Sequence, residues 1–280
     1  MGHVRTRHDG LSMRRTCRLL RLRRSTAYGA KGVRGRTTAT DASVVEAMRK
    51  VRRANPAWGF RLIYAYLRNQ GQKVGRHRAH RLYTGAGMSL HRNPKKPRIK
   101  RVFQELLPPD GINEGWAMDF LSEWVIGEKQ QGVRIINVVD ERSRKDLWVE
   151  ASHSITAAKL VETLDKIGEM RGWPRYVRCD NGPEFISHAL GQWAQARNVE
   201  IKFIQAGKPT QNGIVERLNG TIRKECLNLN WFYSLEEIND LLGQWFKTYN
   251  FDRPHSSLNY ITPSTFENLN QNLYFKMVPQ

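Results

Sequence analysis

Hydrophobic residues change their spacing near residue 116, and this change decides the class of fold. Apolar side chains from Trp116 to Leu121 alternate with period two, which predicts a strand with Asp119 on the same face as Ala117. Further strands are predicted at 133–139, 145–151, 175–179 and 200–205, and helices at 156–171, 187–198 and 212–227. Three strands followed by alternating helices and strands predict an α/β core with a mixed five-stranded sheet covered by helices.

The first part of the chain has helical spacing instead. Asp41 is expected to cap a helix that Asn55-Pro56 ends, a second helix follows Phe60, and a third covers 76–84. Three short helices, the last rich in arginine, are typical of a helix-turn-helix unit that reads the major groove of DNA. An ordinary three-helix bundle with a solvated face is the alternative. The arginines expected to face outward and bind DNA are Arg61, Arg76, Arg78 and Arg81.

Charge is segregated between the two parts. Residues 1–110 contain 27 Lys and Arg against 5 Asp and Glu, a net charge of +22, whereas residues 111–280 have a net charge of −2. This distribution indicates a nucleic-acid-binding part joined to a nearly neutral second module. A smaller helix-turn-helix is one interpretation of residues 12–28, with a solvated basic amphipathic helix as the alternative. The Pro-rich basic segment 91–101 is suited to following phosphates.

Several classes of protein are excluded by composition. No apolar run is long enough to span a bilayer, so no membrane partner is expected. The three cysteines are far apart and unpaired in sequence, which fits a reducing cytosol and gives neither a disulfide framework nor a zinc site.

Three acids stand out in the second part of the chain. Asp119 interrupts one predicted strand, Asp180 ends another, and Glu216 lies early in the last predicted helix, off the apolar stripe of Ile214, Leu218 and Ile222. Asp180 could belong to a surface turn, because Asn-Gly-Pro follows it. Converging acids repel one another unless a divalent cation binds between them, and carboxylate oxygens favour Mg²⁺ or Mn²⁺. Two such ions about 4 Å apart would support phosphodiester transfer.

Linked motifs give a specific resemblance. The acids lie in WAMDF and CDNGPEF, and 35 residues separate Asp180 from Glu216. The segments GKPTQNGIVERLNGTIRKECL and YNFDRPHSSLNYITP complete the pattern. Together they resemble the catalytic core of retroviral integrases and bacterial insertion-sequence transposases of the DDE group. The resemblance implies a ribonuclease-H-like fold, with Asp119, Asp180 and Glu216 as catalytic metal ligands.

The resemblance also implies supporting roles. Arg223, seven residues after Glu216, shares its helix face and is expected to hold the DNA strand. Lys208, Gln211 and Asn212 precede that helix in a loop suited to DNA contacts. Asp140 is interpreted as a turn residue and Glu184 as a residue that supports the site, with direct catalysis as the alternative for each.

These observations predict a transposase that binds the terminal repeats of its mobile element and cleaves and joins DNA strands. The expected partners are element and target DNA and further copies of the chain in the synaptic complex. The product of an upstream reading frame is a further candidate partner. The expected location is the bacterial cytoplasm, in association with the nucleoid. A non-catalytic DNA-binding regulator and a ribonuclease-H-type nuclease are the alternatives. The expected divisions are 1–35 (small helix-turn-helix), 41–97 (DNA-binding domain), 98–111 (basic linker), 112–270 (catalytic core with a C-terminal helix) and 271–280 (tail).

Overall fold

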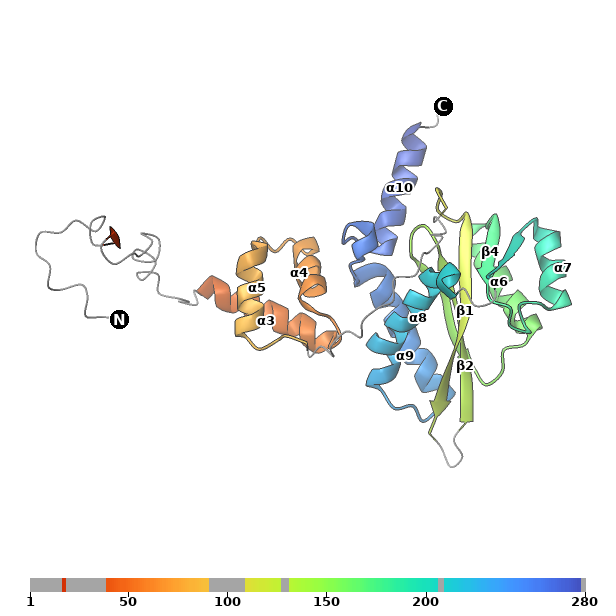
Figure 1. Ribbon diagram of the computed structural model, residues 1–280, viewed down its shortest axis with the longest axis horizontal. Coiled ribbons are helices and arrows are strands. Elements are labelled where there is room, and N and C mark those ends of the chain that lie inside the picture. The colour runs from red at the N-terminus through yellow and green to blue at the C-terminus, as the bar shows by residue number, and fades with distance from the viewer. Residues whose placement is uncertain (1–16, 19–38, 91–108, 127–130, 206–208, 278–280) are drawn as a thin grey trace, which may run out of the picture. The chain divides into compact units, whose positions relative to one another are not determined.

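The computed structural model describes residues 17–18, 39–90, 109–126, 131–205 and 209–277 (Figure 1). Most of the expected helix-turn-helix at 1–35, the basic residues 91–108 and Lys208 lie outside the described residues. The chain divides into two units, Met1–Val44 and Val45–Gln280. Among the described helices, none is both long and apolar enough to cross a membrane.

Three helices form between residues 39 and 85, as the spacing predicted: α3 (Ala39–Ala54), α4 (Phe60–Asn69) and α5 (Arg76–Gly85). The expectation that Asp41 caps α3 is wrong, because the helix begins two residues earlier and Asp41 lies buried in its first turn. Ile63 on α4 and Ala79 on α5 are fully buried. Phe60 packs against Tyr83 with ring centroids 5.4 Å apart, so the two helices share an aromatic contact.

The core contains a five-stranded sheet in the order β3-β2-β1-β4-β5. β1 pairs with β2 and β2 with β3 in antiparallel fashion, whereas β1 pairs with β4 and β4 with β5 in parallel. The strands are β1 (Gly115–Val125), β2 (Gln131–Asp140), β3 (Asp146–Ser152), β4 (Tyr176–Cys179) and β5 (Glu200–Phe203). The expected ribonuclease-H-like core with a mixed sheet is therefore confirmed.

Helices cover both faces of this sheet (Figure 1). Trp116 and Met118 of β1 pack with α6 (Ala157–Arg171) and α7 (His188–Arg197) on one face. Ala117 and Leu121 face the other way and pack with α8 (Gly213–Glu225) and α9 (Leu235–Lys247). Because side chains alternate along β1, the strand contributes residues to two separate apolar layers, one on each face of the sheet.

The C-terminal region differs from the prediction. The helix expected over 212–227 is α8, but it is not the last, since α9 and α10 (Pro263–Met277) follow it. α10 includes the first seven residues of the segment expected to be a tail. α9 has a start signal that could have revealed it, because Ser234 accepts the Glu237 N–H and the Glu237 carboxylate accepts the Tyr233 N–H.

The YNFDRPH segment fastens these C-terminal elements to the sheet. Its first residues form a π-helical turn, Thr248–Asp252, at the end of α9. The buried Asn250 amide bonds to both the N–H (3.0 Å) and the C=O (2.9 Å) of Asp146 in β3. Arg253 makes contacts of 2.9–3.1 Å with Glu225, the last residue of α8. The motif therefore has a structural role.

Candidate active site

Two of the predicted acids come from neighbouring parallel strands. Asp119 lies in β1 between Ala117 and Leu121, whose side chains face α8. Asp180 directly follows β4, in which Arg178 pairs with Ala117 across the strands. Moving two residues along each strand brings Asp119 and Asp180 side by side on the face toward α8, because strand side chains alternate between faces.

Glu216 comes from the first turn of α8, over the same face of the sheet. Val215, Leu218 and Ile222 are buried against the sheet, whereas Glu216 is exposed and lies off this stripe, as predicted. Ile214 is only half-buried, so the stripe passes through Val215 instead. The sheet and α8 thus bring together three carboxylates that are distant in sequence.

Burial and the two neighbouring acids together affect the charge of Asp119. Burial raises the pKa of Asp119 to about 6, and the negative charges of Asp180 and Glu216 add to this effect, against hydrogen bonds from the Phe120 N–H and Asn219. Partial burial also raises the pKa of Glu216. In the part of the chain that the structure describes, no three His, Cys, Asp or Glu side chains gather closely enough to hold one metal ion. The acids therefore share an electrostatic field without forming one coordination sphere.

Two asparagines that the sequence analysis missed hold Asp119. Asn219 on α8 donates its amide to Asp119 Oδ2 (2.8 Å), and Asn137 on β2 donates to Asn219 Oδ1 (2.7 Å). The Phe120 N–H donates to Asp119 Oδ1 (2.8 Å), so neutral groups hold both carboxylate oxygens. Asn219 follows Glu216 by three residues and so lies on a neighbouring part of the helix surface. That spacing could have pointed to Asn219.

The Asn-Gly-Pro turn behind Asp180 fixes that carboxylate. The Gly182 N–H donates to Asp180 Oδ1 (2.9 Å), and the Asn181 amide donates to the Ile204 carbonyl (3.0 Å). A Cβ at residue 182 would lie only 3.1 Å from Asp180 Oδ1. Glycine therefore permits the close approach of backbone and carboxylate.

The other acids singled out from the sequence have partners of their own. Asp140 is fully buried at the end of β2 and accepts the N–H groups of Asn113 (2.6 Å), Arg142 (2.9 Å) and Ser143 (2.7 Å). This agrees with its interpretation as a turn residue. Glu184 forms an ion pair with Arg134, and the hydrogen bond between them lowers the pKa of Glu184.

The residues expected to contact DNA near the acids differ in accessibility. Arg223 donates to the Ser122 carbonyl (3.1 Å), and its side chain remains 42% exposed. Asn212 is only 3% exposed, and its amide donates to the Met118 carbonyl (3.3 Å). Its side chain joins α8 to β1 in this structure, and the expected contact of Asn212 with DNA stays a prediction. Gln211 accepts the Gln205 N–H (2.8 Å) and is half-buried.

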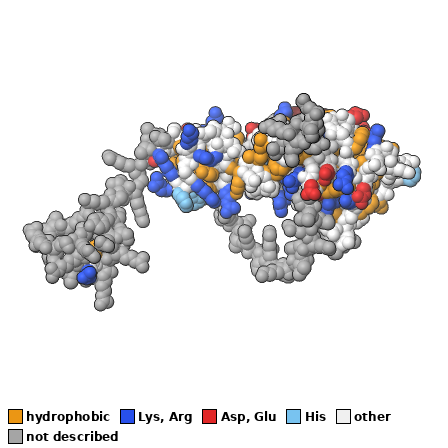
Figure 2. All heavy atoms as spheres, turned by 90° about the horizontal axis from the view of Figure 1, so that it is seen from above, with side chains coloured by type: hydrophobic (Ala, Val, Ile, Leu, Met, Phe, Trp, Pro, Cys, Tyr) orange, Lys and Arg blue, Asp and Glu red, His pale blue; other side chains and the backbone are white. Residues whose placement is uncertain are grey.

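The arginines expected to bind DNA from the three-helix group are exposed: Arg61, Arg76, Arg78 and Arg81. Figure 2 shows Lys, Arg and His side chains crowded on the visible face of these helices. The group therefore presents a cationic surface to solvent.

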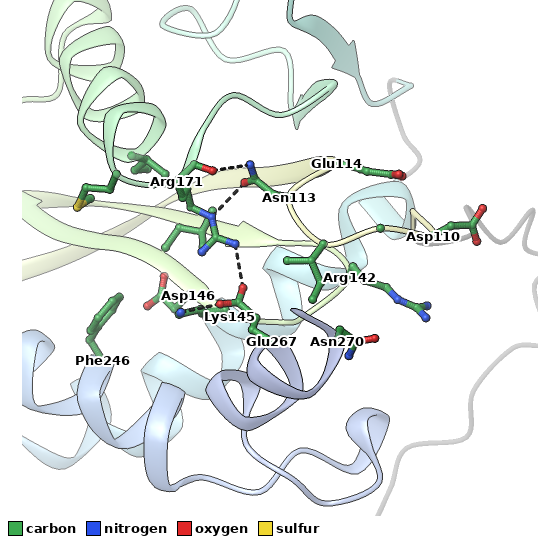
Figure 3. A pocket seen from close by; sticks show the side chains of 15 residues that line it. Asp110, Asn113, Glu114, Arg142, Lys145, Asp146, Arg171, Phe246, Glu267 and Asn270 are labelled. Atoms are coloured by element: carbon green, nitrogen blue, oxygen red, sulfur yellow. Dashed lines mark hydrogen bonds and ion pairs between the residues drawn. The ribbon is translucent and has the colours of Figure 1, made fainter. Parts of the chain in front are cut away.

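A hollow of about 1010 Å³ lies beyond the N-terminal end of β1 (Figure 3). Three of the charged side chains that line it pair with one another. Glu267 on α10 accepts from Arg171 (2.8 Å) and Lys145 (2.6 Å), and Arg171 also donates to Asn113 (3.0 Å). This network ties α10 to α6 and to the β2–β3 turn.

Comparison with known proteins gives consistent matches. Residues 109–209 and 197–263 match two family models that are both described as integrase core domain. A 31.7 kDa protein of insertion element IS407 from Burkholderia multivorans is 36% identical over 256 residues, covering 91% of this chain and 90% of the relative. A 39.2 kDa protein of insertion element IS476 from Xanthomonas euvesicatoria is 36% identical over 259 residues, covering 92% of this chain and 73% of the relative. Among solved structures, the HTLV-2 integrase catalytic core domain in complex with magnesium is 21% identical, with a TM-score of 0.42, covering 55% of this chain and 96% of that one.

Proposed function

The chain belongs to the insertion-sequence transposases of the DDE (integrase) superfamily, and from this premise we propose that it binds the ends of its mobile element and cleaves and joins DNA strands at Asp119, Asp180 and Glu216. One observation carries the assignment of these residues. The sheet and α8 bring the three acids to one face, where the charges of Asp180 and Glu216 add to the burial that raises the pKa of Asp119.

The donor set fits a divalent cation. Carboxylate oxygens are hard ligands suited to Mg²⁺ and Mn²⁺. Burial raises the pKa of Asp119 and the charges of Asp180 and Glu216 add to it, so a bound cation would favour the charged carboxylate. We propose Asp119, Asp180 and Glu216 as the residues that hold the cation, with two ions as the expected number. When bound, such ions stabilise the attacking and leaving oxygens of a phosphodiester.

The protein's own groups prepare this site. Asn219 and the Phe120 N–H orient Asp119, and the Gly182 N–H orients Asp180. Glu216 has no hydrogen-bond partner within the described ranges and lies in the first turn of α8, where the helix dipole favours a carboxylate. Arg223, two turns further along, lies on the same side and can hold the DNA strand through the exposed part of its side chain.

End recognition is assigned to the N-terminal helices. The net charge of +22 on residues 1–110 supplies phosphate attraction, and Arg76, Arg78 and Arg81 place three cations on one short helix. We propose α5 as the recognition helix in the major groove, with Arg61 on α4 contacting the backbone. Lys208 and Gln211 remain proposed contacts beside the catalytic acids.

Joining an element to a new site brings two ends and a target together. We therefore propose that copies of this chain assemble on paired ends, with the product of an upstream reading frame as a further partner. The relatives belong to insertion elements of bacteria, which supports action on the bacterial nucleoid.

Incubation of the full chain with duplexes carrying its element's ends and Mn²⁺ tests the proposal. We expect nicked and joined strands that disappear when Asp119 is replaced by asparagine. A protein that binds the ends but never cuts or joins them, under conditions in which it is folded, would instead be a DNA-binding regulator.

A further inference from the structure

A buried arginine lies in the strand that leads to Asp180, one of the proposed catalytic acids. Arg178 in β4 precedes Asp180 by two residues and is 6% exposed. Because strand side chains alternate, Arg178 and Asp180 point to the same face of the sheet, toward α8. A buried guanidinium is costly unless it is paired and hydrogen-bonded, so its partners indicate what it is for.

The positive charge of Arg178 is paired with the carboxylate of Glu141. Its Nε and Nη2 lie 2.9 and 3.2 Å from the Oε1 and Oε2 of Glu141, a residue only 2% exposed. The Tyr176 hydroxyl donates to the same carboxylate at 2.5 Å. Glu141 therefore neutralises Arg178 and fixes the plane of its guanidinium, as the fork geometry of arginine allows.

The remaining nitrogen reaches the element that carries Glu216. Arg178 Nη1 donates to the carbonyl oxygen of Gln211 at 3.1 Å. Gln211 is followed by Asn212, the N-cap residue of α8, whose amide bonds to the Met118 carbonyl beside Asp119. The start of α8 is thus held by β4 through Arg178 and by β1 through Asn212.

We propose that Arg178 is a positioning residue that sets the start of α8 relative to β4, so that Glu216 can share a cation with Asp119 and Asp180. This inference rests on the proposed function. Arg178 itself does not touch the reacting groups, and it acts only through Gln211 and Glu141. A lysine at this position keeps the charge opposite Glu141, but it cannot contact Glu141 at two points and the Gln211 carbonyl at once.

The experiment compares R178K with a matched control, R171K, using the full chain. Arg171 also lies in the core and pairs with a glutamate at 2.8 Å, but it belongs to the network around Glu267 and not to the acids. Without DNA, the rise of Tm is measured as a function of Mn²⁺ concentration. With DNA, the Mn²⁺ concentration that gives half-maximal joining is measured. End binding by gel shift is measured in parallel.

We expect R178K to need roughly ten-fold more Mn²⁺ in both measurements, with saturating Mn²⁺ restoring joining and with end binding unchanged. R171K should lower Tm but keep the wild-type Mn²⁺ dependence. A merely structural role for Arg178 predicts the same outcome for both variants. An R178K protein that is folded and responds to Mn²⁺ as the wild type does would overturn the inference.

A milder pair of variants keeps the test decisive if R178K does not fold. Y176F removes one hydrogen bond to Glu141, and Y64F removes one from the Tyr64 hydroxyl to the Val74 carbonyl in the three-helix group. We expect a smaller shift in Mn²⁺ requirement for Y176F only, and no shift would also overturn the inference. The proposed function fails separately if Asp119→Asn keeps the Mn²⁺ response of the wild type. The proposed function and the role of Arg178 both fail if the wild-type protein shows no Mn²⁺ response.

Discussion

Replacing Asn219 by alanine tests how Asp119 is held. The substitution removes the amide that donates to Asp119 Oδ2 at 2.8 Å and the oxygen that accepts from Asn137 at 2.7 Å. A hydrogen bond to a charged group contributes about 1.5–3 kcal/mol, which corresponds to about a 12- to 150-fold change in a rate. We expect strand joining to fall within this range. The free energy of unfolding should fall by about 1–2 kcal/mol, because the buried Asn137 amide loses its acceptor.

A double-mutant cycle separates this role from general destabilisation. Asn137 lies across the strands from Asp119 but donates its amide to Asn219, so Asn137→Ala should reduce joining less than Asn219→Ala does. The double variant should then lose no more activity than Asn219→Ala alone. Joining is measured as product yield on paired ends with Mn²⁺, alongside gel shift and Tm. Asn250→Ala is the matched control, since it removes another buried amide that bonds Asp146 away from the acids.

Two results would refute this reasoning. The first is joining by Asn219→Ala within about two-fold of the wild type, because the lost bond would then contribute nothing to the reaction. The second is a double variant whose loss of activation free energy for joining equals the sum of the two single-variant losses. Asn137 would then act independently of Asn219.

Other predictions follow from the same geometry. Replacing any of the three acids by its amide should abolish cleavage and joining while gel shifts show unchanged end binding; near-normal joining removes that residue from the set. Deleting residues 1–101 should eliminate end-specific binding and flatten the salt dependence of DNA affinity. A footprint that persists on the ends would contradict this. Arg223→Ala should reduce joining by about five- to 150-fold and end binding far less, since a charge-assisted phosphate contact is lost; wild-type joining contradicts this. Without metal, the raised pKa of Asp119 should lower stability as pH rises from about 4 to about 6, since the folded state then holds a proton that the unfolded state has released. Asp119→Asn should lack this pH-dependent loss of stability, so the Tm of the variant minus that of the wild type should increase from about pH 4 to about pH 6. A Tm difference that stays constant over this range would count against the raised pKa of Asp119.

The strands and acids could be predicted because their signals are local. The period-two alternation around Asp119 and the turn residues after Asp180 are readable within a few positions, and the 35-residue spacing supplied the third acid. The start of α3 was misjudged because Asp41 is favourable both at a cap and in a first turn, and local chemistry does not separate these positions.

The residues that hold the acids depend on contacts between distant parts of the chain. Asn137 and Asn219 are 82 positions apart, and Asn219 and Asp119 are 100 apart. Arg178 looks like an exposed strand residue until the sheet places Glu141 opposite it. Such partners follow from strand register and helix placement, and only the three-residue spacing from Glu216 to Asn219 points to one of them along the sequence.

The neutral groups around Asp119 have a consequence for how such a site can be lost. Glu141, Glu184, Glu225 and Glu267 each pair with an arginine or lysine within the chain. Asp119, Asp180 and Glu216 have no such ion pair in the portion that the structure describes. Their negative charge is therefore not neutralised by a basic side chain of the described residues, as the proposed cation site requires. A mutation that adds a basic side chain here, such as Asn219→Lys, would satisfy Asp119 from within and turn the site into one more internal ion pair. Under the proposed function, such a variant should lose strand joining while keeping every acid.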